Sequence, residues 1–167
     1  MILLLLLLSL TLTSSKNVIK GSPKTQTHGN QSPREMVNFD FSWRHRLGES
    51  SNDSTKIPNE ASVDYDDTNW MLIDCPHDML IVQPFDPEAS EHQAFLQRNS
   101  GWYRKHFHVP SEWENSTIWI EIEGSFHVTT AYLNGKLITI TPHKQGYTSF
   151  RLRLDIRSFS RDFFFWK

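Results

Sequence analysis

The chain has 167 residues, a single cysteine, a formal net charge of −2 at pH 7 and 13% aromatic residues. This length accommodates one ordinary domain and is too short for a (β/α)₈ barrel, which needs about 200 residues. The small net charge gives no electrostatic case for nucleic acid or an anionic membrane surface as a partner. A disulfide framework is excluded because Cys75 has no partner in the chain, and the aromatic content argues against a disordered protein.

The first residues predict a secretory leader. An unbroken aliphatic run from Ile2 to Leu8 is followed by small and hydroxyl residues up to Ser15. The run is too short to span a bilayer, which needs about 20 residues, but it matches the apolar centre of a signal peptide cut before Lys16. We therefore expect a signal peptide over residues 1–15, no membrane span, and an extracellular or lysosomal destination. A miscalled start codon ahead of a cytosolic protein remains the alternative, because no Lys or Arg precedes the run.

Three Asn-x-Ser/Thr triplets become candidate N-glycosylation sites if the chain is secreted. They begin at Asn30, Asn52 and Asn115, and all lie in stretches that we interpret as loops. We predict N-glycosylation at these three residues. The unpaired Cys75 is compatible with an oxidising compartment if it is buried, and its apolar neighbours favour burial.

Residues 16–35 are polar, without an apolar period, and predict a flexible leader. We expect the folded domain to begin at Met36. Phe39, Phe41 and Trp43 alternate with polar residues, which predicts a strand with one buried face. Residues 76–99 hold three prolines and one short apolar run, and an irregular connection of this length is often functional.

Strand signals are dense after this connection. We expect strands over residues 102–109, 117–123, 126–133, 136–141 and 148–154. Ile118, Ile120 and Ile122 face one side of their strand, and Asn134-Gly135 is a strong hairpin signal. No helix of convincing length is present. The pattern predicts an all-β fold, a β-sandwich or jelly roll.

Two groups of polar residues have a metal-binding interpretation and a simpler one. His106 and His108 lie two apart on one strand, but spacing identifies no third ligand, so an exposed polar face is favoured. Asp64, Asp66 and Asp67 lack the Gly and distal Glu of a calcium loop, so solvated turn residues are favoured. We expect no metal site.

His77 and Asp78 follow Pro76 in the long connection, and Trp102 and Tyr103 follow its end. Aromatic faces beside fixed polar groups suit a sugar, whose C–H faces stack while its hydroxyls form hydrogen bonds. The competing interpretation, favoured by the residues alone, is that His77 and Asp78 hold the loop internally and that both aromatic rings belong to the core.

Six short motifs follow one another along the chain: Phe39-Asp40-Phe41-Ser42-Trp43-Arg44, Asp66-Asp67-Thr68-Asn69-Trp70, Cys75-Pro76-His77-Asp78, Gly101-Trp102-Tyr103-Arg104-Lys105, Tyr132-Leu133-Asn134-Gly135-Lys136 and Gly146-Tyr147-Thr148-Ser149-Phe150. Their types and order resemble those of glycoside hydrolase family 2, which comprises β-galactosidases, β-glucuronidases and β-mannosidases. The stretch from Met36 to Arg157 resembles the N-terminal sugar-binding domain of that family, and is most similar to the β-galactosidase branch.

The resemblance implies a galactose-binding-like jelly roll that precedes an immunoglobulin-like domain and a catalytic barrel. In the family the barrel supplies two glutamates for retaining hydrolysis of terminal β-linked sugars, with carboxyls about 5–5.5 Å apart. No residue of this chain is assigned to either role. The loop from His77 to Asn99 is the part carried over, with His77, Asp78 and Asn99 as expected substrate-binding residues. The expected partners are a carbohydrate and the two further domains; no cofactor is expected.

Two features depart from the family pattern. Met79 stands where the family usually has Trp, and residues 96–99 replace a Gly-rich stretch, both in the sugar-facing loop. Residues 158–167 replace the family's next core strand with an aromatic tail, which we interpret as an aberrant end of a truncated sandwich. The hypotheses are therefore a fragment of a family 2 glycosidase, a freestanding lectin-like module, or a non-functional truncated product.

Overall fold

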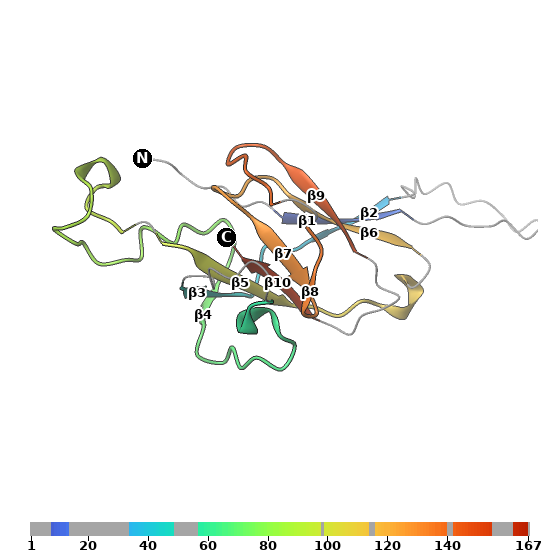
Figure 1. The fold of residues 1–167 in the computed structure, drawn as a ribbon. Helices are drawn as coiled ribbons and strands as arrows, with labels where there is room; N and C mark the ends of the chain where they lie inside the picture. The colour runs from blue at the N-terminus through green and yellow to red at the C-terminus, as the bar shows by residue number, and fades with distance from the viewer. Residues whose placement is uncertain are drawn as a thin grey trace, which may run out of the picture.

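The computed structural model describes residues 8–13, 34–48, 57–97, 99–113, 116–139, 142–154 and 162–166. Its strands form two antiparallel sheets, ordered β2-β1-β6-β9 and β4-β3-β5-β10-β7-β8 (Figure 1). The first sheet contains β1 (Leu8–Thr13), β2 (Arg34–Asn38), β6 (Thr117–Ile122) and β9 (Phe150–Leu154). The second contains β3 (Trp43–Leu47), β4 (Met71–Ile73), β5 (Gly101–His106), β7 (Thr130–Leu133), β8 (Lys136–Leu137) and β10 (Asp162–Trp166).

The core lies between the two sheets. From the first sheet it takes Ile118, Ile120 and Ile122, all buried, as their alternation along the strand predicts. From the second it takes inward-facing residues such as Trp43 and Tyr103. The prediction of an all-β sandwich is confirmed.

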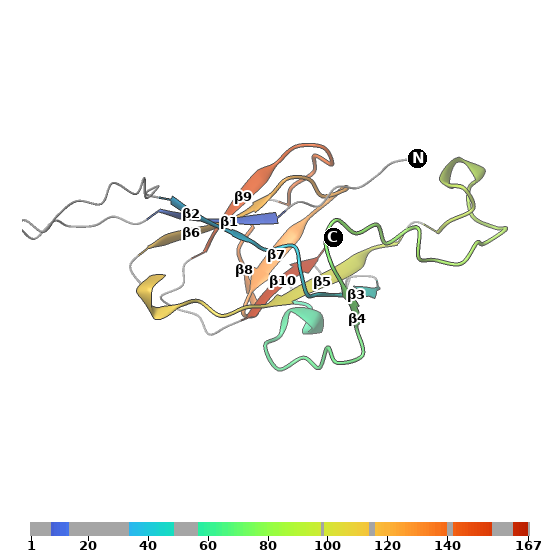
Figure 2. The same ribbon diagram turned by 180° about the vertical axis from the view of Figure 1, so that it is seen from behind.

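A second, smaller cluster covers the outer face of the six-stranded sheet. Residues 57–70, which include the 3₁₀ helix η1 (Asn59–Ala61), lie across that face and pack Ala61 and Trp70 against Trp102 and Tyr132. Successive residues of β5 therefore alternate between two apolar environments, with Trp102 outward and Tyr103 inward. Figure 2 shows the same segment from behind.

The strand predicted around Phe39–Trp43 is wrong. A turn separates β2 from β3 here: Ser42 has φ 59° and its N–H donates to the Asp74 carboxylate at 2.8 Å. Phe39 and Trp43 are buried as expected, and the Trp43 indole donates to the Phe39 carbonyl at 2.7 Å, but Phe41 lies 58% exposed at the turn. Alternation alone does not distinguish a strand from a turn that returns the chain to the same core.

The hairpin predicted at Asn134-Gly135 is confirmed. Both residues have positive φ, 47° and 77°, as a type I′ turn requires, and they join β7 to β8. The strands on either side are shorter than predicted, since β7 begins at Thr130 and β8 ends at Leu137. Residues 126–129 and 138–139 lie in connections instead.

The first and the last segments that the structure describes are both strands. Leu8–Thr13, within the predicted signal peptide, forms β1 between β2 and β6, and the leader and its secretory destination stay predictions. Asp162–Trp166, within the stretch interpreted as an aberrant tail, forms β10 between β5 and β7. Among the residues that the structure describes, no helix is long and apolar enough to cross a membrane.

Candidate functional site

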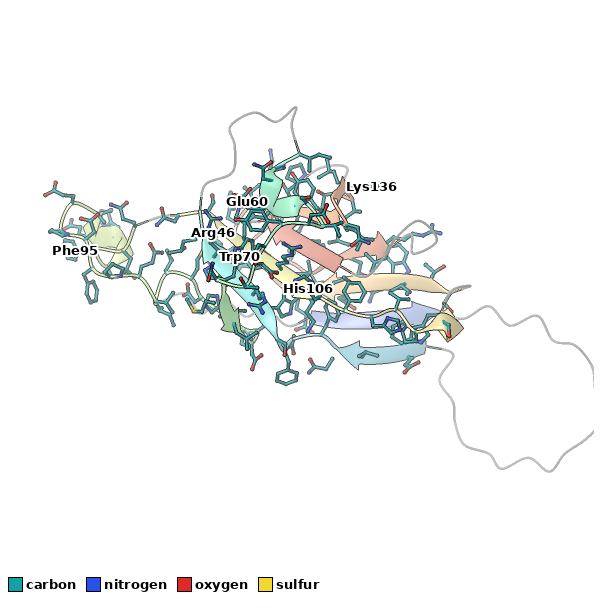
Figure 3. All side chains as sticks on the ribbon, turned by 90° about the horizontal axis from the view of Figure 1, so that it is seen from below. Arg46, Glu60, Trp70, Phe95, His106 and Lys136 are labelled. Carbon is teal, nitrogen blue, oxygen red and sulfur yellow. The ribbon has the colours of Figure 1, made fainter. Side chains whose placement is uncertain are left out.

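The connection between β4 and β5 forms an arm that extends beyond the sheets. It carries the 3₁₀ helix η2 (Glu91–Gln93) near its far end, where Figure 3 shows Phe95 well away from the strands. Several apolar side chains of the arm are exposed: Ile81, Val82, Phe85 and Phe95. The arm therefore presents an apolar surface without a partner among the described residues.

Three rings meet where the arm joins the sandwich. The ring centroid of His45, on β3, lies 4.8 Å from that of His77 and 4.6 Å from that of Tyr103. His45 is 1% exposed and its Nδ1 is 3.1 Å from the Trp102 carbonyl oxygen. The alternation of β3 places His45 on the same inward face as Trp43, a signal that the sequence analysis did not use.

The Tyr103 hydroxyl fixes the orientation of His77, with its oxygen 2.9 Å from Nδ1 of the imidazole. Burial, reinforced by negative charge at Cys75 and Asp78, raises the pKa of the Tyr103 phenol above its usual value. The phenol therefore keeps its proton in neutral solution, and its contact with His77 is a hydrogen bond between two neutral groups.

Close packing beneath the arm depends on Gly101. A Cβ at this position would lie 2.8 Å from Cε1 of His45 and 2.9 Å from Sδ of Met79. Met79 is buried against this glycine and does not face solvent. The residue at position 79 therefore contributes to the packing beneath the arm.

The three predicted substrate-binding residues lie on the arm but do not share one contact. Asp78 accepts a hydrogen bond from the Leu80 N–H at 2.9 Å, while His77 bonds to Tyr103. Asn99, at the other end of the arm, donates to the Gln83 side chain at 2.7 Å. Gln83 in turn donates to the Met79 carbonyl at 3.1 Å, so a short chain of hydrogen bonds connects Asn99 with the segment after Asp78.

The far part of the arm is closed by Asp86. Its carboxylate accepts hydrogen bonds from the Glu88 N–H at 2.9 Å and from the Gln97 side chain. The Asp86 N–H donates to the Phe95 carbonyl at 2.8 Å, across the neck of the loop. These contacts make residues 86–97 a closed unit.

Replacing Asp86 by Asn should open this unit. The hydrogen bonds from Gln97 and Glu88 hold the pKa of the Asp86 carboxyl below its usual range. The ionised Asp86 carboxylate stabilises the closed unit fully at any pH above the pKa of this group in the unfolded chain. Because the pKa in the folded chain is lower, this stabilisation is lost as the pH falls through the folded-state pKa. The protection factors for hydrogen exchange at the amides of residues 88–95, which are corrected for the pH dependence of intrinsic exchange, should fall in Asp86→Asn at neutral pH, and in the parent chain only in acid. Unchanged exchange would contradict the role of Asp86.

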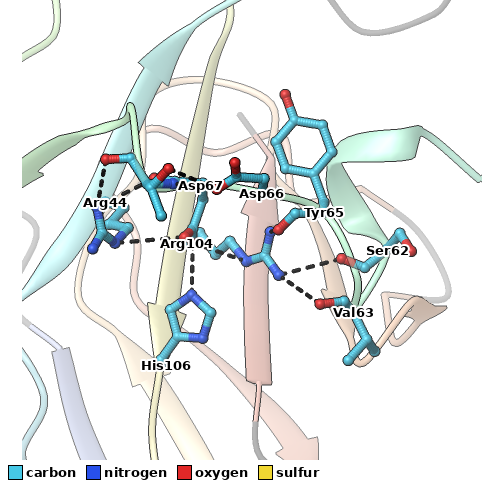
Figure 4. A network of polar contacts seen from close by, with 9 residues as sticks. Arg44, Ser62, Val63, Tyr65, Asp66, Asp67, Arg104 and His106 are labelled. Carbon is cyan, nitrogen blue, oxygen red and sulfur yellow. Dashed lines mark hydrogen bonds and ion pairs between the residues drawn. The ribbon is translucent and has the colours of Figure 1, made fainter.

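A second polar cluster, missed by the sequence analysis, surrounds Asp67 (Figure 4). This residue was expected to be solvated, but it is 7% exposed. Its carboxylate lies 3.2 Å from Nε of Arg104 and 2.6 Å from Nε2 of His106. Arg104 also donates to the carbonyl of Tyr65 at 2.8 Å, and to those of Ser62 and Val63. The cluster attaches residues 62–70 to the outer face of the sheet and therefore has a structural role.

The remaining predicted sites have simpler surroundings. His106 contacts Asp67 and His108 is exposed, and no described group of three or more His, Cys, Asp or Glu side chains is placed to hold a metal ion. Asp64 and Asp66 are exposed, as expected. Asn30, Asn52 and Asn115 lie outside the described residues.

The arm and its base thus remain the candidate site. They bring together an imidazole, a carboxylate, amide groups and exposed aromatic rings. These groups suit hydrogen bonding and stacking with a polyhydroxylated ligand.

Comparison with curated proteins identifies glycosidases. The chain is 31% identical over 121 residues to the β-galactosidase BoGH2A of Bacteroides ovatus, and 30% identical over 120 residues to a β-galactosidase of Thermoanaerobacter pseudethanolicus. These matches cover 71% and 70% of this chain but only 13% and 14% of the two relatives. No family model matches the chain.

Solved structures agree with this result. A β-glycosidase of Bacteroides vulgatus superposes with a TM-score of 0.64 at 27% identity, covering 79% of this chain and 16% of that one. A glycosyl hydrolase family 2 member from Bacteroides cellulosilyticus gives 0.59 at 26% identity, covering 77% and 16%. Sequence relatives and structural neighbours thus point to the same family over the same β-sandwich, and the chain belongs to glycoside hydrolase family 2 through this domain.

Proposed function

We propose that this chain serves as the N-terminal sugar-binding domain of a β-galactosidase-like glycosidase. The observation that supports the proposal most strongly is the arm of residues 76–99. It extends beyond the sheets, exposes apolar side chains, and is held in shape by hydrogen bonds between its own residues. The chain spans 13–14% of the length of the curated β-galactosidases it matches, so a domain that operates beside others is consistent with the comparison.

In this proposal no residue of the domain takes part in cleaving the glycosidic bond. Catalysis in a retaining glycosidase requires two carboxyl groups about 5–5.5 Å apart across the scissile bond, and these belong to a barrel. The arm supplies positioning: Asp78 and Asn99 hold hydroxyl groups, His77 fixes the base of the arm through Tyr103, and the arm's apolar face packs on the catalytic domain. The substrate class is a terminal β-linked sugar.

The test is a fusion with a relative of known activity. The full 167-residue chain replaces the matched 121-residue segment of the Bacteroides ovatus β-galactosidase, and hydrolysis of a nitrophenyl β-galactoside is measured. We expect activity clearly above that of the relative lacking the segment, and a several-fold rise in KM or loss of kcat in Asn99→Ala. Asn69→Ala, an exposed residue on another segment, is the matched control. A folded fusion no more active than the deletion form would overturn the proposal.

A further inference from the structure

Two connections that are distant in sequence are joined at one end of the sandwich. Thr129, before β7, and His143, after β8, exchange two backbone hydrogen bonds of 2.8 and 3.0 Å. The Thr129 hydroxyl also donates to the Ser125 hydroxyl at 2.7 Å in a buried position. In Figure 1 both connections lie near the beginning of β7. They form a fixed base, so side chains that project from them have defined positions.

Exposed aromatic rings project from this base. Phe126 is 40% exposed and Tyr147 is 73% exposed, and their ring centroids lie 6.0 Å apart with an interplanar angle of 57°. The His127 ring is 5.4 Å from that of Phe126. Large aromatic side chains usually contribute their area to a core or an interface, so a group of them left in solvent points to a ligand or partner.

Gly146 makes room for the first of these rings. A Cβ on this residue would lie 2.4 Å from Cδ2 of Phe126, far inside contact distance. The φ of Gly146 is not in the left-handed region, in contrast to that of Gly135. The glycine is therefore required by the close approach of the Phe126 ring and not by its own backbone conformation. Space for this ring is built into the fold.

Polar groups stand beside the rings. The His143 ring stacks on Phe150 with centroids 4.0 Å apart, and its Nε2 is 2.7 Å from the Gln145 carbonyl and 3.4 Å from the Thr148 hydroxyl. Gln145 and Thr148 are exposed. Residues 124–129 and 142–149 contain one charged side chain, Lys144. Hydroxyl and amide groups beside aromatic faces, with little charge, suit a neutral ligand with both C–H faces and hydroxyls.

We propose that Phe126 and Tyr147 form a saccharide-stacking surface for neutral pyranoses. The two rings take the apolar faces of the sugar, while Gln145 and Thr148 meet its hydroxyl groups. The surface is formed by connections other than the arm of residues 76–99. It therefore does not depend on the function proposed above.

Titration of the full chain with lactose tests this surface, with NMR saturation transfer and chemical-shift changes as readouts and sorbitol as a hydroxylated ligand without a pyranose face. We expect saturable binding of lactose but not sorbitol. Phe126→Ala and Tyr147→Ala should each weaken it about 3- to 10-fold, the range for loss of one aromatic stacking contact. Tyr147→Phe, which keeps the ring, should retain most of the affinity.

The control is Phe41→Ala, which removes another exposed ring, at the turn between β2 and β3. It should leave the affinity unchanged, and thermal melting should show that all variants fold. Absence of lactose binding, or equal losses in Phe41→Ala and Tyr147→Ala, would overturn the proposal. Binding lost only in Asn99→Ala would also overturn it and would leave the function proposed for the arm intact.

Discussion

Replacing Arg104 by Met is expected to lower the free energy of unfolding by about 3–5 kcal/mol, the usual cost of removing one partner from a buried ion pair. The Arg104 side chain is 1% exposed and that of Asp67 is 10% exposed. Without the guanidinium the Asp67 carboxylate loses its buried positive partner, and three carbonyls of residues 62–65 each lose one hydrogen bond. Methionine fills similar space, so the loss is mainly electrostatic.

Chemical denaturation of the two proteins measures this difference. The matched control is Arg151→Met, which removes an ion pair with Glu121 whose arginine side chain is 54% exposed. Exposed pairs contribute about 0–1 kcal/mol, so this variant should stay close to the parent chain. Equal effects of the two substitutions would show that burial of the Asp67 cluster does not matter in solution.

Trp43→Ala should cost about 3–5 kcal/mol, as for other large-to-small changes of buried aromatic residues. The Trp43 side chain is 1% exposed and packs edge-on against Phe39 with ring centroids 5.7 Å apart. Truncation leaves a cavity between the sheets and also removes the donor to the Phe39 carbonyl. For a domain with an ordinary stability of about 5–15 kcal/mol, this is a large fraction of the total.

The comparison for this variant is Leu72→Ala on β4, where the side chain is 66% exposed. Surface substitutions of this kind stay within about 0.5 kcal/mol of the parent. Thermal melting should separate the two variants by many degrees. A Trp43→Ala protein that melts with the parent chain would show that the core between the sheets is not closed around this indole.

Local patterns in the sequence predict the strands that have one apolar face. Ile118, Ile120 and Ile122 identify β6, and Asn134-Gly135 identifies the hairpin between β7 and β8, because each signal depends on neighbours in the chain. The turn at Ser42 was missed because it is fixed by Asp74, 32 residues away. A pattern of residue types carries no information on such a distant partner.

For the candidate site, too, local features can be predicted from the sequence, whereas contacts between distant segments cannot. The sequence indicates the arm by its length and by Pro76-His77-Asp78, and the structure places these residues on it. The burial of Asp67 and the packing of His45 against His77 arise from contacts between segments far apart in sequence. Charged residues such as Asp67 and Arg104 appear solvated in a sequence because each is buried only in the presence of the other.

The position of β10 has a consequence for biosynthesis. This strand pairs with β5 on one side and β7 on the other, although both are made long before residues 162–166. Until then the six-stranded sheet lacks a central member, and β5 and β7 each present an edge with unpaired amides and carbonyls. The sheet can close only after Trp166 has left the ribosome exit tunnel. Assembly is therefore late and dominated by long-range pairing, which slows folding and gives chaperones time to act on the exposed edges.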